Sequence, residues 1–71
     1  MEAVVYIGDN VKRVRTLRAL TQVELAEKAG ITQSTVVLIE RNKSEPHMST
    51  IRKLAEALGV DPAELVKEEW A

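Results

Sequence analysis

The chain has 71 residues, of which 45% are hydrophobic and 3% aromatic, and it contains neither Phe nor Cys. A chain of this length forms one domain and buries only about 60% of its unfolded surface. We therefore expect a single domain over residues 1–71, with a core of aliphatic side chains in closely packed short helices. The absence of cysteine excludes disulfide bonds and thiolate metal sites.

No apolar run approaches the roughly 20 residues that span a bilayer. The first seven residues are acidic, unlike the basic start of a signal peptide. These features predict a soluble cytoplasmic protein without a membrane partner.

Charge is distributed unevenly along the chain. The net charge is −1, but residues 10–53 hold nine basic and four acidic side chains, a local charge of +5. Residues 54–71 hold one basic and five acidic side chains, a local charge of −4. Positive charge gathered in one segment indicates an anionic partner such as nucleic acid, although a solvated surface with chance segregation remains the alternative.

The first helix is predicted from a stripe of apolar residues. Ile7, Val11 and Val14 lie at helical spacing, Leu17 continues the stripe, and the pattern predicts a helix from about residue 9 to residue 19. Residues 1–7 before it favour either a short strand or an apolar arm.

The second helix has clear signals at both ends. Thr21 followed three residues later by Glu24 is a capping box, which predicts a helix start. Gly30 stands where a left-handed residue would end the helix. The sequence therefore predicts a helix over residues 22–29.

A third helix begins almost at once. Thr32 is a second N-cap, and the predicted helix covers residues 33–41, with Asn42 in a left-handed position after it. Two helices joined so closely must cross at a wide angle, which is the geometry of a helix-turn-helix. The third helix would then project from the surface and be able to enter a DNA major groove.

Two more helices are predicted in the remaining sequence. Apolar residues from Ile51 to Leu58 have helical spacing, and Gly59 ends that helix. Asp61, followed by Pro62, is a strong helix start and predicts a fifth helix to about residue 69. Residues 66–71 form an acidic tail.

The order of these motifs resembles that of the phage repressor and Cro family of helix-turn-helix proteins, which share the lambda-repressor-like fold. The resemblance runs from about residue 7 to residue 65. It is carried by Leu20-Thr21-Gln22, Glu24-Leu25-Ala26, Ala29-Gly30-Ile31, Ser34-Thr35-Val36, Ile39-Glu40-Arg41, Pro46, Thr50, Leu54-Ala55 and Ala57-Leu58-Gly59-Val60. It implies an all-α five-helix bundle that binds operator DNA, usually as a dimer.

The same resemblance implies two sets of DNA contacts and one ion pair. In the family, Arg15 and Glu40 correspond to a salt bridge between the first and third helices. A Gln in the position of Gln33 can form two hydrogen bonds with adenine, and a helix N-terminus such as that at Gln22 attracts phosphates. The implied base-contacting residues are Gln33, Ser34, Thr35 and Leu38, and the implied phosphate-contacting residues are Arg15, Thr21, Gln22, Arg41 and Lys43.

The third helix departs from the family pattern in the run Val36-Val37-Leu38-Ile39. A helix cannot bury four consecutive residues against one scaffold. Three interpretations stay open for Val37 and Leu38: contact with thymine methyl groups, binding of a protein, or a slight rotation of the helix that half-buries both.

Enzymatic activity is not expected. His47 is the single histidine, no nucleophilic triad can be assembled, and Asp9, Asp61 and Glu64 are better explained as helix caps. The sequence predicts no metal, no cofactor and no small-molecule ligand.

The leading hypothesis is a sequence-specific transcriptional regulator that binds double-stranded DNA, with helix 33–41 in the major groove. A dimeric repressor that occludes its operator is the simplest form. The alternative is a protein-interaction module on the same scaffold, an antitoxin-like or coactivator-like adaptor. For the homodimer interface we expect Val4, Val5, Tyr6 and Trp70, unless Tyr6 and Trp70 pack against each other within one chain.

Overall fold

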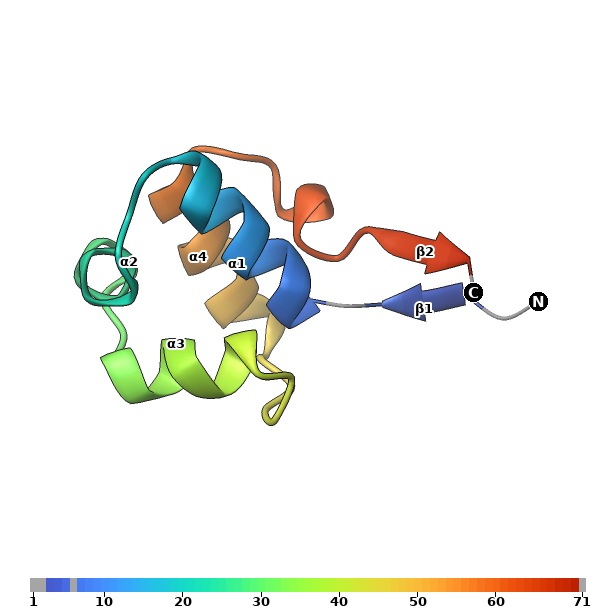
Figure 1. The fold of residues 1–71 in the computed structure, drawn as a ribbon, viewed down its shortest axis with the longest axis horizontal. Coiled ribbons are helices and arrows are strands. Elements are labelled where there is room, and N and C mark those ends of the chain that lie inside the picture. Colours follow the sequence, from blue (N-terminus) through green and yellow to red (C-terminus); the bar gives the residue numbers. More distant parts are fainter. Residues whose placement is uncertain (1–2, 6, 71) are drawn as a thin grey trace.

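The computed structural model describes residues 3–5 and 7–70, and the side chains of residues 7–67. Within these described residues, four α-helices pack together, and a two-stranded ribbon projects beyond them at one end (Figure 1). In chain order the elements are β1 (Ala3–Val5), α1 (Ile7–Leu17), α2 (Gln22–Ala29), α3 (Gln33–Glu40), α4 (Met48–Leu58), a 3-10 turn (Pro62–Glu64) and β2 (Glu68–Trp70). The predicted all-α bundle is confirmed, but the prediction of five α-helices is wrong, because the described residues form four α-helices and a 3-10 turn.

The core is aliphatic, as the composition predicts. Every helix contributes to it, and Leu65 closes it from the segment after the 3-10 turn. The buried hydrophobic residues are Val11, Val14, Leu25, Ala26, Ala29, Val36, Ile39, Ile51, Leu54, Ala55, Leu58 and Leu65.

The ends of α2 and α3 follow the predicted local signals. Thr21 and Glu24 form the complete capping box, with each side chain bonded to the other residue's backbone N–H. Thr32 Oγ1 accepts a hydrogen bond from the N–H of Thr35 at the start of α3. Gly30 has a φ of 70° and Asn42 a φ of 56°, both in the left-handed region.

Helix α1 begins and ends two residues earlier than predicted, and Leu17 is not part of the core. The Leu17 side chain is 73% exposed. Arg18 follows the last residue of α1 and is exposed, and its Nε donates to the carbonyl of Leu58 at 3.0 Å. Ala19 then turns the chain with a φ of 56°.

The predicted fifth helix starts as expected but does not continue. Asp61 Oδ1 accepts a hydrogen bond from the N–H of Ala63 at 2.9 Å, yet only the 3-10 turn follows. The carbonyl of Leu65, which a helix would bond to residue 69, instead accepts a hydrogen bond from Asn10 Nδ2 at 3.0 Å. A helix of about eight residues is marginal on its own, so these long-range bonds decide the outcome.

The chain ends pair with each other in an antiparallel ribbon. Ala3 lies opposite Trp70, Val4 opposite Glu69 and Val5 opposite Glu68. Residues 3–5 therefore form a strand, and much of the acidic tail forms its partner. Residue 6 and the side chains of Val4, Val5 and Trp70 lie outside what the structure describes, so the expected packing of Tyr6 on Trp70 does too.

Among the described residues, none of the helices has the length and apolar character needed to cross a bilayer.

Candidate nucleic-acid interface

Helix α3 has one face in the core and one face in solvent. Val36 and Ile39 are fully buried, and the carboxylate-bearing Glu40 is buried beside them. On the opposite face Gln33, Ser34 and Leu38 are exposed, as is Arg41 just after the helix, while Val37 is partly buried. We call the set Gln33, Ser34, Val37, Leu38 and Arg41 the outward face of α3.

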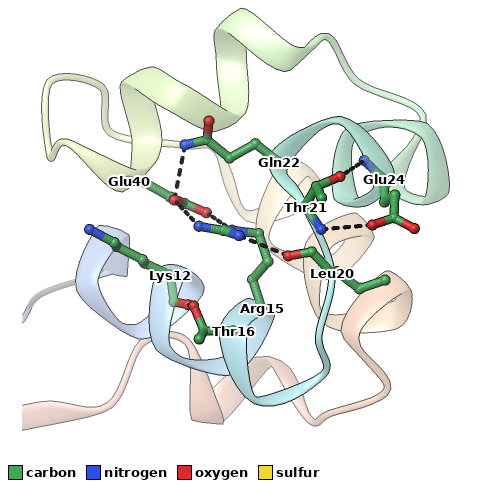
Figure 2. A network of polar contacts seen from close by, with 8 residues as sticks. All are labelled: Lys12, Arg15, Thr16, Leu20, Thr21, Gln22, Glu24 and Glu40. Carbon is green, nitrogen blue, oxygen red and sulfur yellow. Dashed lines mark hydrogen bonds and ion pairs between the residues drawn. The ribbon is translucent and has the colours of Figure 1, made fainter.

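A single carboxylate joins α3, which carries this face, to α1 and α2. Glu40 on α3 accepts hydrogen bonds from Arg15 Nε at 2.7 Å and Arg15 Nη2 at 3.1 Å. Its Oε1 atom also accepts a hydrogen bond from the amide nitrogen of Gln22, at the start of α2, at 3.2 Å. Figure 2 shows the three side chains converging from α1, α2 and α3.

The ion pair is mostly shielded from water. The side chains of Arg15 and Glu40 are 14% and 4% exposed, respectively. The hydrogen bond that Arg15 donates to Glu40 holds the pKa of Arg15 above its ordinary value, against the opposing effect of burial and with the help of the Glu40 charge. Arg15 Nη1 also donates to the carbonyl of Leu20 at 2.8 Å, which fixes the turn before α2.

A second link holds the same, C-terminal end of α3 against the start of α1. The N–H of Gly8 donates to Asn42 Oδ1 at 3.1 Å, and Asn42 Nδ2 donates to Asp9 Oδ1 at 3.1 Å. Sequence reasoning predicted the left-handed backbone of Asn42 but not these bonds. Asp9 was expected to cap a helix, but it lies inside the first turn of α1 and accepts this bond.

Sequence reasoning also missed Asn10, a buried polar residue. Its amide group donates to the carbonyls of Leu65 and Lys67, at 3.0 Å and 3.3 Å, and so ties the C-terminal segment to α1. A signal for it exists, because Asn10 stands at an apolar position of the stripe that contains Ile7 and Val14. A polar residue at such a position needs a hydrogen-bond partner when it is buried.

Four of the predicted phosphate-contacting residues lie near the C-terminal end of α3. Arg15 and Gln22 lie together at the Glu40 carboxylate, and Arg41 and Lys43 are exposed at the C-terminal end of the helix. Thr21 is exposed, but its N–H donates to Glu24 Oε1 at 2.9 Å and its Oγ1 accepts from the N–H of Glu24 at 3.1 Å. Only its hydroxyl hydrogen is left to donate elsewhere.

The predicted base-contacting residues differ in how exposed they are and in whether their polar atoms already form hydrogen bonds. Gln33 and Ser34 are exposed in the first turn of α3. The Thr35 hydroxyl lies 2.8 Å from that of Thr32, so it is partly occupied within the cap. Leu38 is 47% exposed and Val37 is partly buried, while Ile39 is fully buried, so the first two keep part of their surface available to a partner.

Among the side chains that the structure describes, no three His, Cys, Asp or Glu residues lie close enough together to hold a metal ion.

Two short helices joined by a tight turn, the second with an exposed outward face, define a helix-turn-helix domain. The helix-turn-helix family model HTH_3 matches residues 11–65. The chain belongs to this family of DNA-binding transcriptional regulators, which confirms the resemblance found in the sequence.

Individual relatives and solved structures agree with this assignment. The chain is 43% identical over 63 residues to the immunity repressor protein of Bacillus phage phi105, a match that covers 89% of this chain and 44% of the phage protein. The fold is similar to that of the restriction-modification controller protein C.AhdI from Aeromonas hydrophila, with a TM-score of 0.83, 36% identity and coverage of 86% of this chain and 92% of that one. It is also similar to that of the biofilm regulator SinR in complex with DNA, with a TM-score of 0.82, 34% identity and coverage of 86% and 98%.

The chain thus spans less than half the length of the phage repressor, although it spans nearly all of the two solved chains.

Proposed function

We propose that the protein is a sequence-specific repressor that binds double-stranded DNA as a homodimer, with α3 in the major groove. The observation that carries the proposal is that the outward face of α3 is exposed while the opposite face of the helix is fixed against the core. Val36 and Ile39 anchor that helix in the core, and Glu40 fixes it to α1 and α2. A preorganised helix of this kind can present side chains to base edges in a fixed register.

The sequence reading would begin at the N-terminal end of α3. Gln33 offers a donor and an acceptor, which match the N6 and N7 atoms of adenine in the major groove. Ser34 and Thr35 are short enough to allow a close approach to a base edge or a phosphate. These side chains are our candidates for hydrogen-bonded base contacts.

Phosphate binding is supported by a count of hydrogen-bond donors in the Glu40 cluster. A guanidinium group has five N–H donors, and Arg15 uses three of them on Glu40 and Leu20. The Gln22 amide has two N–H donors and uses one on Glu40. Three N–H groups therefore remain, beside an α2 N-terminus whose dipole favours anions.

Arg41 and Lys43 supply further cations just after Glu40, at the same C-terminal end of α3, where both side chains are exposed. The phosphate contacts from the Glu40 cluster and from this pair would then lie near the C-terminal end of α3, while Gln33 lies at its N-terminal end. Such contacts set the register of a protein on DNA without reading its sequence.

Selection of bound sequences from a pool of random duplexes tests the proposal. We expect enrichment of one near-palindromic motif, and we expect the Gln33→Ala variant to lose that enrichment while it keeps salt-sensitive binding to random DNA. Weak binding to every duplex without any enriched motif would overturn the proposal. It would favour the alternative of a protein-interaction module on this scaffold.

A further inference from the structure

The middle of the outward face of α3 is apolar. Leu38 is 47% exposed and Val37 beside it is partly buried. Ser34 lies one helical turn before Leu38 and Arg41 one turn after it, and both are exposed. An aliphatic side chain therefore stands between a polar start and a cationic end on one helix face.

An exposed leucine on a recognition surface has few suitable partners in the major groove. Base edges there present hydrogen-bond donors and acceptors, and the C5-methyl group of thymine is the apolar exception. Leucine pressed onto a polar edge would remove water from that edge without replacing its hydrogen bonds, which is unfavourable. Leu38 should therefore favour thymine and disfavour the other bases.

We propose that Leu38 is a specificity-determining residue that reads the C5-methyl group of a thymine, with Val37 completing the apolar contact. This inference rests on the proposed function. Gln33 and Leu38 are five residues apart, about 7.5 Å along the helix at 1.5 Å per residue. The thymine therefore lies within about two base-pair steps of the base that Gln33 reads, at 3.4 Å per step.

A protein partner fits this surface less well than DNA. One exposed leucine and one partly buried valine offer far less than the roughly 800 Å² that each partner contributes to a stable protein–protein interface. The apolar patch is also continuous with Gln33 and Ser34 on one side and with the cationic Arg41 on the other. That combination suits a groove bordered by phosphates.

The test uses the duplex motif recovered by selection, in which each thymine is replaced in turn by uracil. Uracil lacks only the methyl group, so hydrogen bonding is unchanged. We expect one uracil position in each half-site to weaken binding of the unaltered protein by about fourfold, the value of one buried methyl group. In the Leu38→Ala variant the same replacement should have no further effect.

Leu17→Ala is the matched control, because Leu17 is a 73% exposed leucine on α1 and lies outside the outward face of α3. It should retain the full uracil penalty, and thermal melting of both variants should show that they remain folded. A motif that depends on Gln33 but tolerates uracil at every position would overturn the role of Leu38 and leave the proposed function intact. Persistence of the uracil penalty in Leu38→Ala would overturn that role in the same way, whereas absence of any motif would overturn both proposals.

Discussion

Gly8 and Asn42 are 34 residues apart in the sequence, yet the backbone N–H of Gly8 donates to Asn42 Oδ1 at 3.1 Å. A Cβ atom at position 8 would lie 2.1 Å from the carbonyl oxygen of Ile39 and 2.6 Å from Asn42 Oδ1. The first turn of α1 thus packs directly on the backbone at the end of α3. Only glycine permits this approach, and it is one reason why α3 has a fixed position.

Gly8→Ala is therefore expected to destabilise the domain. By helix propensity alone, alanine inside a helix is about 1 kcal/mol more favourable than glycine. The contact with a backbone oxygen should reverse that sign and lower the free energy of unfolding by about 1–3 kcal/mol, as overpacking generally does. Urea denaturation of both proteins measures the difference.

Gly59→Ala is the control for this prediction. Gly59 has a φ of 71°, but nothing lies within 4 Å of the position that a Cβ atom would take. The Gly59→Ala substitution should lower the free energy of unfolding by about 1–2 kcal/mol, because alanine is strained in the left-handed conformation. It should not displace α3. A more stable Gly8→Ala protein would show that α1 and α3 do not meet in this way.

The Arg15–Glu40 pair should contribute to stability as a unit. Removal of either partner leaves a mostly buried charge without its counterion, which typically costs about 3–5 kcal/mol. We expect Arg15→Ala and Glu40→Ala each to lower the free energy of unfolding by about 3 kcal/mol, and the double variant to lose clearly less than the sum. A double-mutant cycle in urea gives the coupling energy.

Lys53→Ala serves as the comparison, because Lys53 is an exposed cation on α4. It should change the free energy of unfolding by no more than about 0.5 kcal/mol. A coupling energy near zero between Arg15 and Glu40 would reduce the two residues to independent charges and remove the physical basis of the Glu40 cluster.

Gln33 and Gln22 should affect DNA binding in different ways. Gln33→Ala is expected to weaken binding to the selected motif by about 1–3 kcal/mol and to leave binding to scrambled DNA nearly unchanged, because a base contact carries sequence information. Gln22→Ala should weaken binding to both duplexes alike, because phosphates are the same in each. Fluorescence anisotropy at several salt concentrations measures both effects.

Since Gln22 also donates to Glu40, its loss should reduce stability by about 0.5–1.5 kcal/mol, the usual contribution of one hydrogen bond. Binding is therefore compared well below the melting temperature of the variant. If both variants lose only specific binding, the division between base and phosphate contacts is wrong.

The helix-turn-helix was predictable because its signals are local. The capping box of Thr21 and Glu24, the left-handed positions of Gly30 and Asn42, and the apolar spacing within each helix all act over a few residues. These signals gave α2 its observed bounds and α3 its observed start.

The errors arose where distant segments meet. Asn10 bonds to the carbonyl of Leu65, 55 residues away, and so competes with helix formation at the C-terminal end. The third donor to Glu40 was not inferred either, because the resemblance implied for Gln22 a contact with a phosphate and not a bond within the chain. Pairing of the two chain ends likewise depends on contacts that no local pattern contains.

Acid should weaken the cap of α2. The backbone N–H of Thr21, together with its side chain and the charge of Lys28, holds the pKa of the Glu24 carboxyl below its ordinary value. A pKa that is lower in the folded protein gives stability that is present above the unfolded value, about 4.3, and lost as the pH falls through the folded value. Glu24→Gln can keep the capping box but does not titrate.

Urea denaturation of the two proteins between pH 7 and pH 3 measures this contribution. The advantage of the unaltered protein over Glu24→Gln should be constant above about pH 5.5 and should shrink toward pH 3. Other carboxyl groups titrate equally in both proteins, so the difference isolates Glu24. A difference that does not vary with pH would show that Glu24 makes no contribution through its charge.

The last prediction concerns the homodimer and its interface. A two-stranded ribbon is at best marginally stable alone, and β1 and β2 together form a sheet of only two strands at one end of the molecule (Figure 1). A second copy that adds its strands to this ribbon would stabilise it and leave the outward face of α3 free for DNA. Two-fold symmetry would then require a near-palindromic operator with half-sites about 34–36 Å, or a multiple of that distance, apart.

Sedimentation equilibrium should show a dimer at tens of micromolar for the full chain and a monomer for a chain without residues 1–5 and 70–71. Circular dichroism should show that the shortened chain keeps its helices, because the core residues all lie between Val11 and Leu65. A monomeric full chain, or a shortened chain that still dimerises, would place the interface elsewhere or remove it.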